Sequence, residues 1–464
     1  MPRRIADVFP PCPSRPANAK AYPDDSYETL ELDIQVVTPM FGGGAEAGVP
    51  DPVTLIRPSS IRGHLRFWWR ATRGAECSSI EELKRREVEI FGDTEHPSPF
   101  VLKILVHSSA LQRCAEFRWN PNARQGKGGY RLDWHSALTA QTPNAIPYAL
   151  FPFQGKQPKR PQPGEEPEQM PAWMSLPFTF HLQLSFPRKS AIELHAAMWG
   201  WINFGGVGAR TRRGCGTLSC PTYSPSASQP ETIREWMLDA RKHLAGGATA
   251  GLFSTAFRCL LVASREQKPT AAWNRAIVAL RDFRQGSGIG RNGTQGRSFW
   301  PEPETIRRLT GQRLPKHQPQ DDVIPNDGFP RAEFGLPIVF HFKDGARDQH
   351  SQQQDPRETE LYPVVNGERS NRMASPLLIK ALAAADGTAM PLIAALRTPE
   401  LDEVELVSEG QGILGSSVCR IRDARFATYD RSPLKGRSPR GSAIDAFIEF
   451  ATTDRSFKRL EVQP

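Results

Sequence analysis

Residues 57–73 read RPSSIRGHLRFWWRATR, which places arginine and tryptophan together at helical spacing. On a helix, residues three or four positions apart share a face. The arginines of this run recur at that spacing and predict one basic ridge, made of Arg62, Arg66, Arg70 and Arg73. The apolar residues predict a stripe that faces the core, made of Ile61, Leu65 and Trp68 or Trp69.

The basic ridge is of a kind that binds a polyanion, and it suits RNA. The planar guanidinium of arginine grips a phosphate through two hydrogen bonds and can also stack on a base, which lysine cannot do. Gly63 lowers helix propensity inside the run, which indicates close approach to the helix backbone. Ser59 and Ser60 stand where a serine can cap a helix. The alternative is a surface helix with a solvated charged face and tryptophans in the core.

A second cluster, residues 205–216, reads GGVGARTRRGCG and follows an apolar-periodic stretch at 191–202. It lacks the Gly-Lys-Ser/Thr ending of a P-loop, and no Gly-x-Gly-x-x-Gly opens a helix after a strand, so neither nucleotide-cofactor motif is present. Backbone amides and three arginines can grip a sugar-phosphate chain. A glycine-rich turn between helix and strand explains the glycines but not Arg210, Arg212 and Arg213.

The periodic segments of the first half alternate in type. Alternation predicts strands at 29–38 and 178–186, and an apolar run predicts a third at 100–106. Helices are predicted in the arginine-rich run, at 80–90 and at 191–202, with an edge strand at 216–220. Strand, helix, strand, strand, helix, strand is the order of a ferredoxin-like domain. The RNA-recognition module has this fold and exposes its four-stranded sheet.

The second half is less regular. A helical face begins near residue 233, a strand is predicted at 257–262 and a helix at 271–283. Leu336 to Phe342 alternate as another strand. Residues 378–383 and 391–396 flank Asp386-Gly387 and predict a hairpin.

Composition agrees with an anionic partner without identifying one. Lysine and arginine number 59 against 50 aspartate and glutamate, which gives a net charge of +9 and a pI near 9.3. The seven cysteines form no Cys-x-x-Cys pair, so reduced thiols in a cytoplasmic protein are expected. No signal peptide or membrane-spanning run is recognisable. No zinc-type ligand spacing is present, and we expect neither a metal nor a cofactor.

Collinear blocks from about residue 30 to 380 resemble the RAMP (repeat-associated mysterious protein) superfamily of CRISPR systems. More narrowly, they resemble the first subunit of the type III-B Cmr effector complex. The blocks are residues 38–43, 57–70, 90–92, 204–218, 296–302, 329–337 and 372–377.

The resemblance implies an α+β fold of tandem ferredoxin-like, RNA-recognition-module-like domains with loop insertions. We expect a flexible segment at residues 1–25 and a RAMP domain at 26–222. A Pro-rich insertion is expected near 152–171 and a second domain with insertions at 229–464.

The resemblance also implies a noncatalytic subunit in antiviral defence. It would cap the end of the complex, hold the 3′ region of the guide RNA with its target RNA, and dock on other RAMP subunits. The candidate RNA-binding residues of the first cluster are Arg57, Ser59, Arg62, His64, Arg66, Trp68, Trp69 and Arg70. Those of the second cluster are Gly205, Gly206, Gly208, Arg210, Arg212 and Arg213. Further RNA-binding candidates lie in segments interrupted by glycine or proline, and they are Arg291, Arg297, Trp300, Arg331 and Arg372.

Two alternatives stay open. The first is a metal-independent RAMP endoribonuclease that processes CRISPR RNA with His64, although cleavage needs both a base and an acid and His64 has no evident partner. The second is a scaffold whose arginines bind acidic protein surfaces. Trp300 is expected either to stack on bases or to anchor a loop in a core.

Overall fold

The computed structural model describes residues 26–460, except for 46–48, 52, 107–112, 123–128, 135–144, 151–172, 176–177, 245–256, 291–297, 316, 318–327, 343–353, 409–411, 414–418 and 429–430. The candidates Arg291 and Arg297, the segment 1–25 and the Pro-rich insertion lie outside the described residues.

The first sheet consists of β1 (Tyr27–Val36), β3 (Val101–Val106), β7 (Phe178–Pro187) and β8 (Leu218–Ser219) in the order β3-β7-β1-β8. All of its neighbouring strands are antiparallel, and Leu32 lies opposite Leu182. Two helices complete it, α1 (Pro58–Ala71) between β1 and β3 and α6 (Ala191–Phe204) between β7 and β8. These elements agree with the sequence predictions, and their order is consistent with a ferredoxin-like unit.

Buried and exposed side chains alternate along β1, which shows which face of this sheet packs against the core. Leu32, Ile34 and Val36 of β1 are buried, whereas Glu31 and Asp33 between them are exposed. On the open face Asp33 pairs with His181 of β7, and Glu31 accepts a hydrogen bond from Gln183. This face carries two carboxylates on its central strand, so it lacks the charge that would attract RNA.

A second four-stranded sheet repeats the same arrangement. It consists of β9 (Phe257–Val262), β13 (Leu377–Ala383), β14 (Ala389–Leu396) and β18 (Lys458–Arg459), in the order β13-β14-β9-β18. Helix α9 (Pro269–Gln285) follows β9, and α11 (Ala443–Asp454) precedes β18. The predicted hairpin is β13 paired with β14. We propose that the boundary between the two units lies at residues 222–229, before α7 (Pro230–Leu244).

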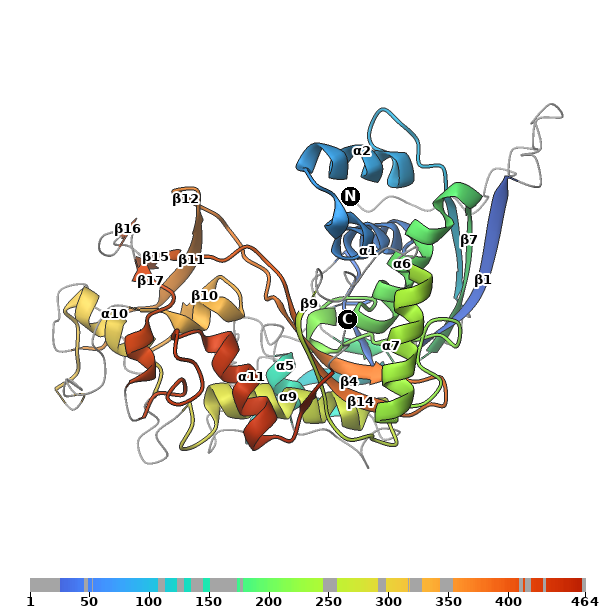
Figure 1. The fold of residues 1–464 in the computed structure, drawn as a ribbon. Helices are drawn as coiled ribbons and strands as arrows, with labels where there is room; N and C mark the ends of the chain where they lie inside the picture. Colours follow the sequence, from blue (N-terminus) through green and yellow to red (C-terminus); the bar gives the residue numbers. More distant parts are fainter. Residues whose placement is uncertain are drawn as a thin grey trace, which may run out of the picture.

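The two sheets belong to one layered stack (Figure 1). Helices α1 and α6 lie between them, because their buried side chains share one core with Leu32 of the first sheet and with Leu378 and Leu392 of the second. Helices α9 and α11 cover the other face of the second sheet. Every residue of β13 and β14 is therefore buried, which explains their continuous apolar sequence.

The insertions build a further sheet, which the sequence did not predict. It contains β10 (Ile338–Phe340), β11 (Thr359–Val365), β12 (Glu368–Arg369), β15 (Glu403–Ser408), β16 (Gly412–Ile413) and β17 (Cys419–Arg420). The strand predicted at 336–342 belongs here and not to the second ferredoxin-like sheet. Figure 1 shows these strands and α10 (Glu302–Thr310) to one side of the stack.

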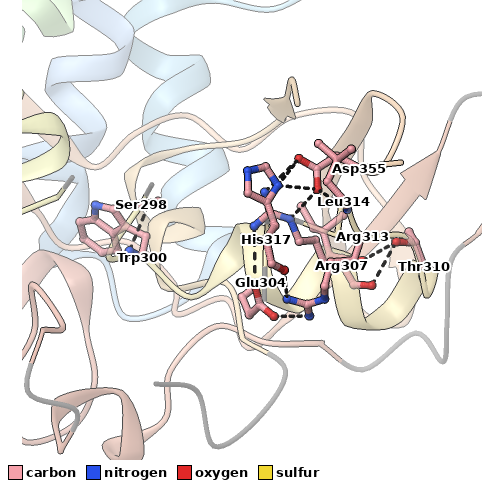
Figure 2. Close-up of polar contacts among 10 residues, drawn as sticks. Ser298, Trp300, Glu304, Arg307, Thr310, Arg313, Leu314, His317 and Asp355 are labelled. Atoms are coloured by element: carbon pink, nitrogen blue, oxygen red, sulfur yellow. Dashed lines mark hydrogen bonds and ion pairs between the residues drawn. The ribbon is translucent and has the colours of Figure 1, made fainter. Parts of the chain in front are cut away.

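A polar network joins α10 to the segment before β11 (Figure 2). Asp355 is buried; its carboxylate accepts a hydrogen bond from Arg307 at 2.9 Å and pairs with His317 at 2.9 Å. These two partners outweigh burial and lower the pKa of the Asp355 carboxyl. Glu304 pairs in turn with Arg313 and with Arg307. The network satisfies its own charges and holds the inserted sheet against its helix.

The remaining described elements are short or peripheral. Helix α2 (Ile80–Phe91) confirms a sequence prediction and is capped by Ser79, whose hydroxyl accepts from the Glu82 amide. A small sheet joins β2 (Met40–Phe41), β6 (Trp173–Ser175), β4 (Arg113–Asn120) and β5 (Gly129–Trp134). Helix α5 (Ile146–Ala149) contributes to the core beside α9. None of the helices in the described parts of the chain is long and apolar enough to cross a membrane.

Candidate nucleic-acid interface

Helix α1 presents three different faces. Its apolar stripe is buried as predicted, with Ile61, Leu65 and Trp69 at 0% exposure. Trp68 is also buried and packs against Phe204 and Phe257. This position corrects the prediction that Trp68 and Trp69 bind RNA, because both indoles lie in the core between the sheets.

The arginine ridge of α1 lies against other parts of the chain. Arg62 stacks on Phe100, with its guanidinium carbon 4.3 Å from the ring centre. Arg66 donates to the Gly92 carbonyl at 2.7 Å, and both Arg66 and Arg70 pair with Glu87 of α2. The spacing of the arginines was correctly predicted, but Arg66 and Arg70 are paired with a carboxylate of α2, and Arg62 is stacked on a ring just before β3. The ridge is therefore not an open phosphate-binding surface.

The start of α1 also differs from the prediction. Pro58 occupies the first turn, where its missing N–H costs nothing, and the cap residue is Arg57. Arg57 pairs with Asp51 at 2.9 Å, so its charge is balanced. Ser59 and Ser60 lie inside the first turn and are exposed; they do not cap the helix.

The third face of α1 is open, and we call it the open strip. Its members recur at helical spacing and are Ser60, Gly63, His64 and Phe67. A side chain added at Gly63 would meet nothing within 4 Å, so the close approach that Gly63 indicates is not made by the described chain. Phe67 is 39% exposed although it is a large apolar residue. The exposed Phe67 ring therefore lies beside a stretch of helix backbone that no side chain of the described residues covers.

His64 is half-buried in the open strip. Its ring lies nearly parallel to the indole of Trp201, with the ring centres 6.3 Å apart and 12° between the planes. Burial disfavours the charged imidazolium and lowers the pKa of His64 below its ordinary value. The ring is therefore neutral at physiological pH.

The glycine loop, residues 205–216, packs against residues 38–43, so two separate sequence blocks meet here. Val207 donates to the Gly216 carbonyl at 3.0 Å, and Gly216 donates to the Pro39 carbonyl at 3.0 Å. A side chain at Gly205 would collide with Trp201 and Trp68, and Gly208 adopts a φ of +79°. These glycines are therefore required by close packing, as in the alternative interpretation of the loop.

The three arginines of the loop reach across to other segments. Arg210 donates to the Ala149 carbonyl at 2.6 Å, and Arg212 donates to the Ser375 carbonyl. Arg213 donates to the Leu377 carbonyl at 2.8 Å and lies at the junction between the loop and β13. Carbonyl oxygens accept these bonds, and Arg213 also donates to the Ser375 hydroxyl at 3.0 Å.

Together with Arg284 and Arg372, these residues form what we call the arginine cluster, made of Arg210, Arg212, Arg213, Arg284 and Arg372. Burial and, after it, the charges of Arg210 and Arg284 lower the pKa of Arg213 to about 9. Burial and then Arg372 lower the pKa of Arg212. No carboxylate contributes to either shift. Among the described residues no carboxylate offsets the mutual repulsion around Arg212 and Arg213, which makes their surroundings a favourable place for phosphate.

The open strip and the arginine cluster adjoin each other. The guanidinium of Arg212 lies over the ring of Phe67, 5.6 Å from its centre. Arg372 is exposed and raises the positive potential around Arg212. The structure thus brings Phe67 of the open strip together with Arg212 of the glycine loop, although 145 positions separate them in sequence.

Two candidates from the second half are structural. Trp300 is 2% exposed and donates to the Arg284 carbonyl at 3.0 Å, so it anchors a loop in the core and cannot stack on a base. Arg331 pairs at 3.1 Å with Glu302, which is fully buried. Of the candidates there that the structure describes, Arg372 alone is exposed.

Sequence reasoning missed Phe67, Arg284 and Lys380. Phe67 carried a usable signal, because it shares the spacing of Ser60 and Gly63 on a face separate from the apolar stripe. Lys380 is fully buried in β13 and donates to the Gly205 carbonyl at 2.6 Å. Burial lowers its pKa to about 7. No group of three metal-ligating side chains occurs among the described residues.

A comparison with known protein families finds a match in the first half of the chain. Residues 33–219 match the family model of the RAMP superfamily. The Cmr subunit Cmr1-2 of the CRISPR system of Pyrococcus furiosus is 27% identical over 194 residues, which cover 41% of this chain and 94% of that protein.

Solved structures are similar over more of the chain but at lower identity. The apo crystal structure of Cmr1 from Pyrococcus furiosus has a TM-score of 0.43 at 14% identity, covering 81% of this chain and 89% of that one. A chain of the type III-B Cmr-beta complex bound to cognate target RNA has a TM-score of 0.44 at 11% identity, covering 88% and 98%. Residues 33–219 thus match the RAMP superfamily, and part of the chain is similar to the Cmr subunit Cmr1-2 of a CRISPR system.

Proposed function

We propose that this protein is a noncatalytic RNA-binding subunit of a type III-B CRISPR effector complex. It holds the 3′ region of the guide RNA and its target RNA at the end of the assembly and docks on other RAMP subunits. The observation that carries the RNA-binding role is the arginine cluster beside the open strip. The RAMP match and the similarity to a Cmr subunit support the assignment to an effector complex.

The proposed contacts divide by chemistry. Arg372 and Arg212 pair with phosphates, since their guanidinium groups lack a carboxylate partner among the described residues. Phe67 offers an exposed ring on which a base can stack. Gly63 lets the RNA approach the helix backbone. Phosphate contacts carry no base information, so sequence is read by pairing between guide and target.

The test is direct binding of single-stranded RNA, measured by fluorescence anisotropy at moderate salt. Arg372→Gln removes an exposed cation of the cluster and should weaken binding several-fold for unrelated sequences alike. Arg85→Gln is the matched control, because Arg85 is an exposed arginine of α2 that pairs with Glu89. Equal affinity of the Arg372 variant and the wild-type protein would remove the arginine cluster from the interface.

The effector assignment needs a separate experiment. A tagged copy purified from its host should bring along short CRISPR guides and other RAMP subunits. Recovery of the protein alone would contradict membership in the complex.

The nuclease alternative is tested by incubating the protein with repeat RNA in EDTA. Acid–base cleavage needs a second group near His64. Within the described residues no carboxylate or second histidine forms a hydrogen bond with His64, which supports the noncatalytic role. Cleavage that His64→Ala abolishes would establish the nuclease instead.

A further inference from the structure

We propose that His64 contacts a ribose 2′-hydroxyl of the bound strand and makes this site prefer RNA over DNA of the same sequence. The inference rests on the proposed function, because it concerns the same surface. It assigns a specific contact and a specificity role to a histidine that the sequence offered only as a general RNA-binding candidate or as a catalytic residue.

The position of His64 fixes what its ring can do. The imidazole lies nearly parallel to Trp201, whose indole N–H is itself bonded to the Gly206 carbonyl at 3.1 Å. The stacked pair thus holds the imidazole face against α6 and beside the glycine loop. Neither ring nitrogen of His64 forms a hydrogen bond with a described residue, and neither is a buried atom without a partner. The nitrogens therefore face solvent or a ligand.

The chemistry of His64 selects among the parts of a nucleotide. Its neutral ring presents one donor and one acceptor. A phosphate oxygen can only accept hydrogen bonds, so the nearby arginines are better partners for it than His64. A ribose 2′-hydroxyl both donates and accepts, and it is the group that distinguishes RNA from DNA. The neutral imidazole is therefore matched to the sugar and not to the phosphate.

The neighbours of His64 provide for the other two parts of the nucleotide. Phe67, three positions along the helix, offers a stacking surface for the base. Arg212 lies over Phe67 and, with Arg372, supplies charge for the phosphate. Gly63 leaves the helix surface next to His64 free of side chains. In a nucleotide the sugar lies between the base and the phosphate. We therefore assign the contact with the sugar to His64, the contact with the base to Phe67 and the contact with the phosphate to the arginines.

The experiment measures the affinity of single-stranded RNA and of DNA with the same sequence by fluorescence anisotropy. His64→Phe keeps a ring on Trp201 but removes both nitrogens. We expect its RNA affinity to fall about 3- to 10-fold, which is the effect of one hydrogen bond, while its DNA affinity stays unchanged. His64→Asn keeps a donor and an acceptor and should retain part of the RNA preference.

Controls separate this inference from the proposed function. His341→Phe replaces an exposed histidine of the inserted sheet and should change neither affinity. Arg372→Gln should weaken RNA and DNA equally. If wild-type protein binds RNA but His64→Phe keeps the wild-type ratio of RNA to DNA affinity, the role of His64 is overturned and the RNA-binding function stands. If wild-type protein binds neither strand, the proposed function itself fails.

A second experiment uses modified RNAs and wild-type protein only. It tests the contact even if the His64→Phe variant does not fold. RNAs with a single 2′-deoxy nucleotide at successive positions are bound to wild-type protein. The proposal requires at least one position where loss of the hydroxyl lowers affinity about 3-fold or more. Uniform affinity along the strand would exclude a specific 2′-hydroxyl contact.

Discussion

The groups that face an arginine decide whether it stabilises the fold or is available to a ligand. This chain contains arginines of both kinds. Arg66 and Arg70 pair with Glu87, whose side chain is only 11% exposed. Arg372 has an exposed side chain and stands among other arginines. The first two stabilise the packing of α2 on α1, whereas the last is available to an anion.

Glu87→Gln should destabilise the fold, because the carboxylate of Glu87 serves two arginines in a half-buried site. We expect a loss of about 1–3 kcal/mol in the free energy of unfolding, measured by urea denaturation. Glu89→Gln is the matched control on the same helix. Its pair with Arg85 is more than half exposed on both sides and contributes about 0.3–0.5 kcal/mol. Similar losses for both variants would contradict the buried-pair argument.

Lys380 makes stability depend on pH. Its pKa is about 7 in the folded protein against an ordinary value of 10.5. Between these values the unfolded chain holds a proton that the folded protein has released, so stability rises with pH across this window. The contribution is complete above pH 10.5 and is lost as the pH falls towards 7.

Lys380→Met should abolish that rise. We expect the free energy of unfolding of the wild-type protein, relative to this variant, to increase by up to roughly 1.4 kcal/mol per pH unit between pH 7 and 9.5. Urea denaturation of both proteins at several pH values measures this difference in the free energy of unfolding. The contributions of the other titrating groups are the same in both proteins and cancel in the difference. Lys103→Met, at an exposed position of β3, should run parallel to the wild type. Parallel behaviour of the Lys380 variant would mean that Lys380 titrates normally.

At the scale of elements, α1 shows how one helix can serve three surroundings. Its apolar stripe faces the core, its arginine ridge faces α2 and β3, and its open strip faces outward beside the glycine loop. Amphipathic spacing predicted the first face and the alignment of the second. It did not predict that the basic face would be covered and that the face with Gly63 would be open.

Two glycines of neighbouring helices should respond in opposite ways to alanine. Gly63→Ala meets no atom within 4 Å and should stabilise the protein by about 0.5–1 kcal/mol through helix propensity. Gly200→Ala places its Cβ 3.0 Å from Trp68 and should destabilise it. Thermal denaturation measures both. Gly63→Ala should also weaken RNA binding, and unchanged binding would show that RNA does not approach the helix there.

At the scale of the whole molecule, charge is distributed unevenly. The chain carries a net charge of +9, yet the open face of the first sheet has carboxylates on its central strand. Positive charge that no carboxylate of the described residues balances gathers around Arg213, at the junction of the glycine loop with the second sheet. RNA is therefore expected along this junction and not across the sheet face that an RNA-recognition module uses.

RNA affinity should fall steeply with salt, and the slope identifies the contacts. For single strands the logarithm of affinity falls by about 0.7 per neutralised phosphate for each decade of salt. Arg372→Gln should reduce the slope by about that amount, whereas Arg85→Gln should leave it unchanged. Anisotropy titrations at several salt concentrations measure both, and an unchanged slope for Arg372→Gln would place this arginine away from phosphate.

The sequence by itself determined the helices and strands of the first sheet, the hairpin of the second sheet and the resemblance of residues 33–219 to the RAMP superfamily. These features follow from spacing and from local residue preferences, which act between neighbours in the chain. The sequence also predicted that the glycine loop carries charges that packing alone does not explain.

Only the tertiary structure decided which arginines stay available. Whether Arg66 meets Glu87, whether Trp300 is buried, and whether Arg212 comes to lie over Phe67 depend on contacts between segments far apart in sequence. The inserted sheet escaped prediction for the same reason, because its short strands are specified by their partners and not by their own patterns. Periodicity shows which residues share a face, but the neighbour that covers that face is set by the fold as a whole.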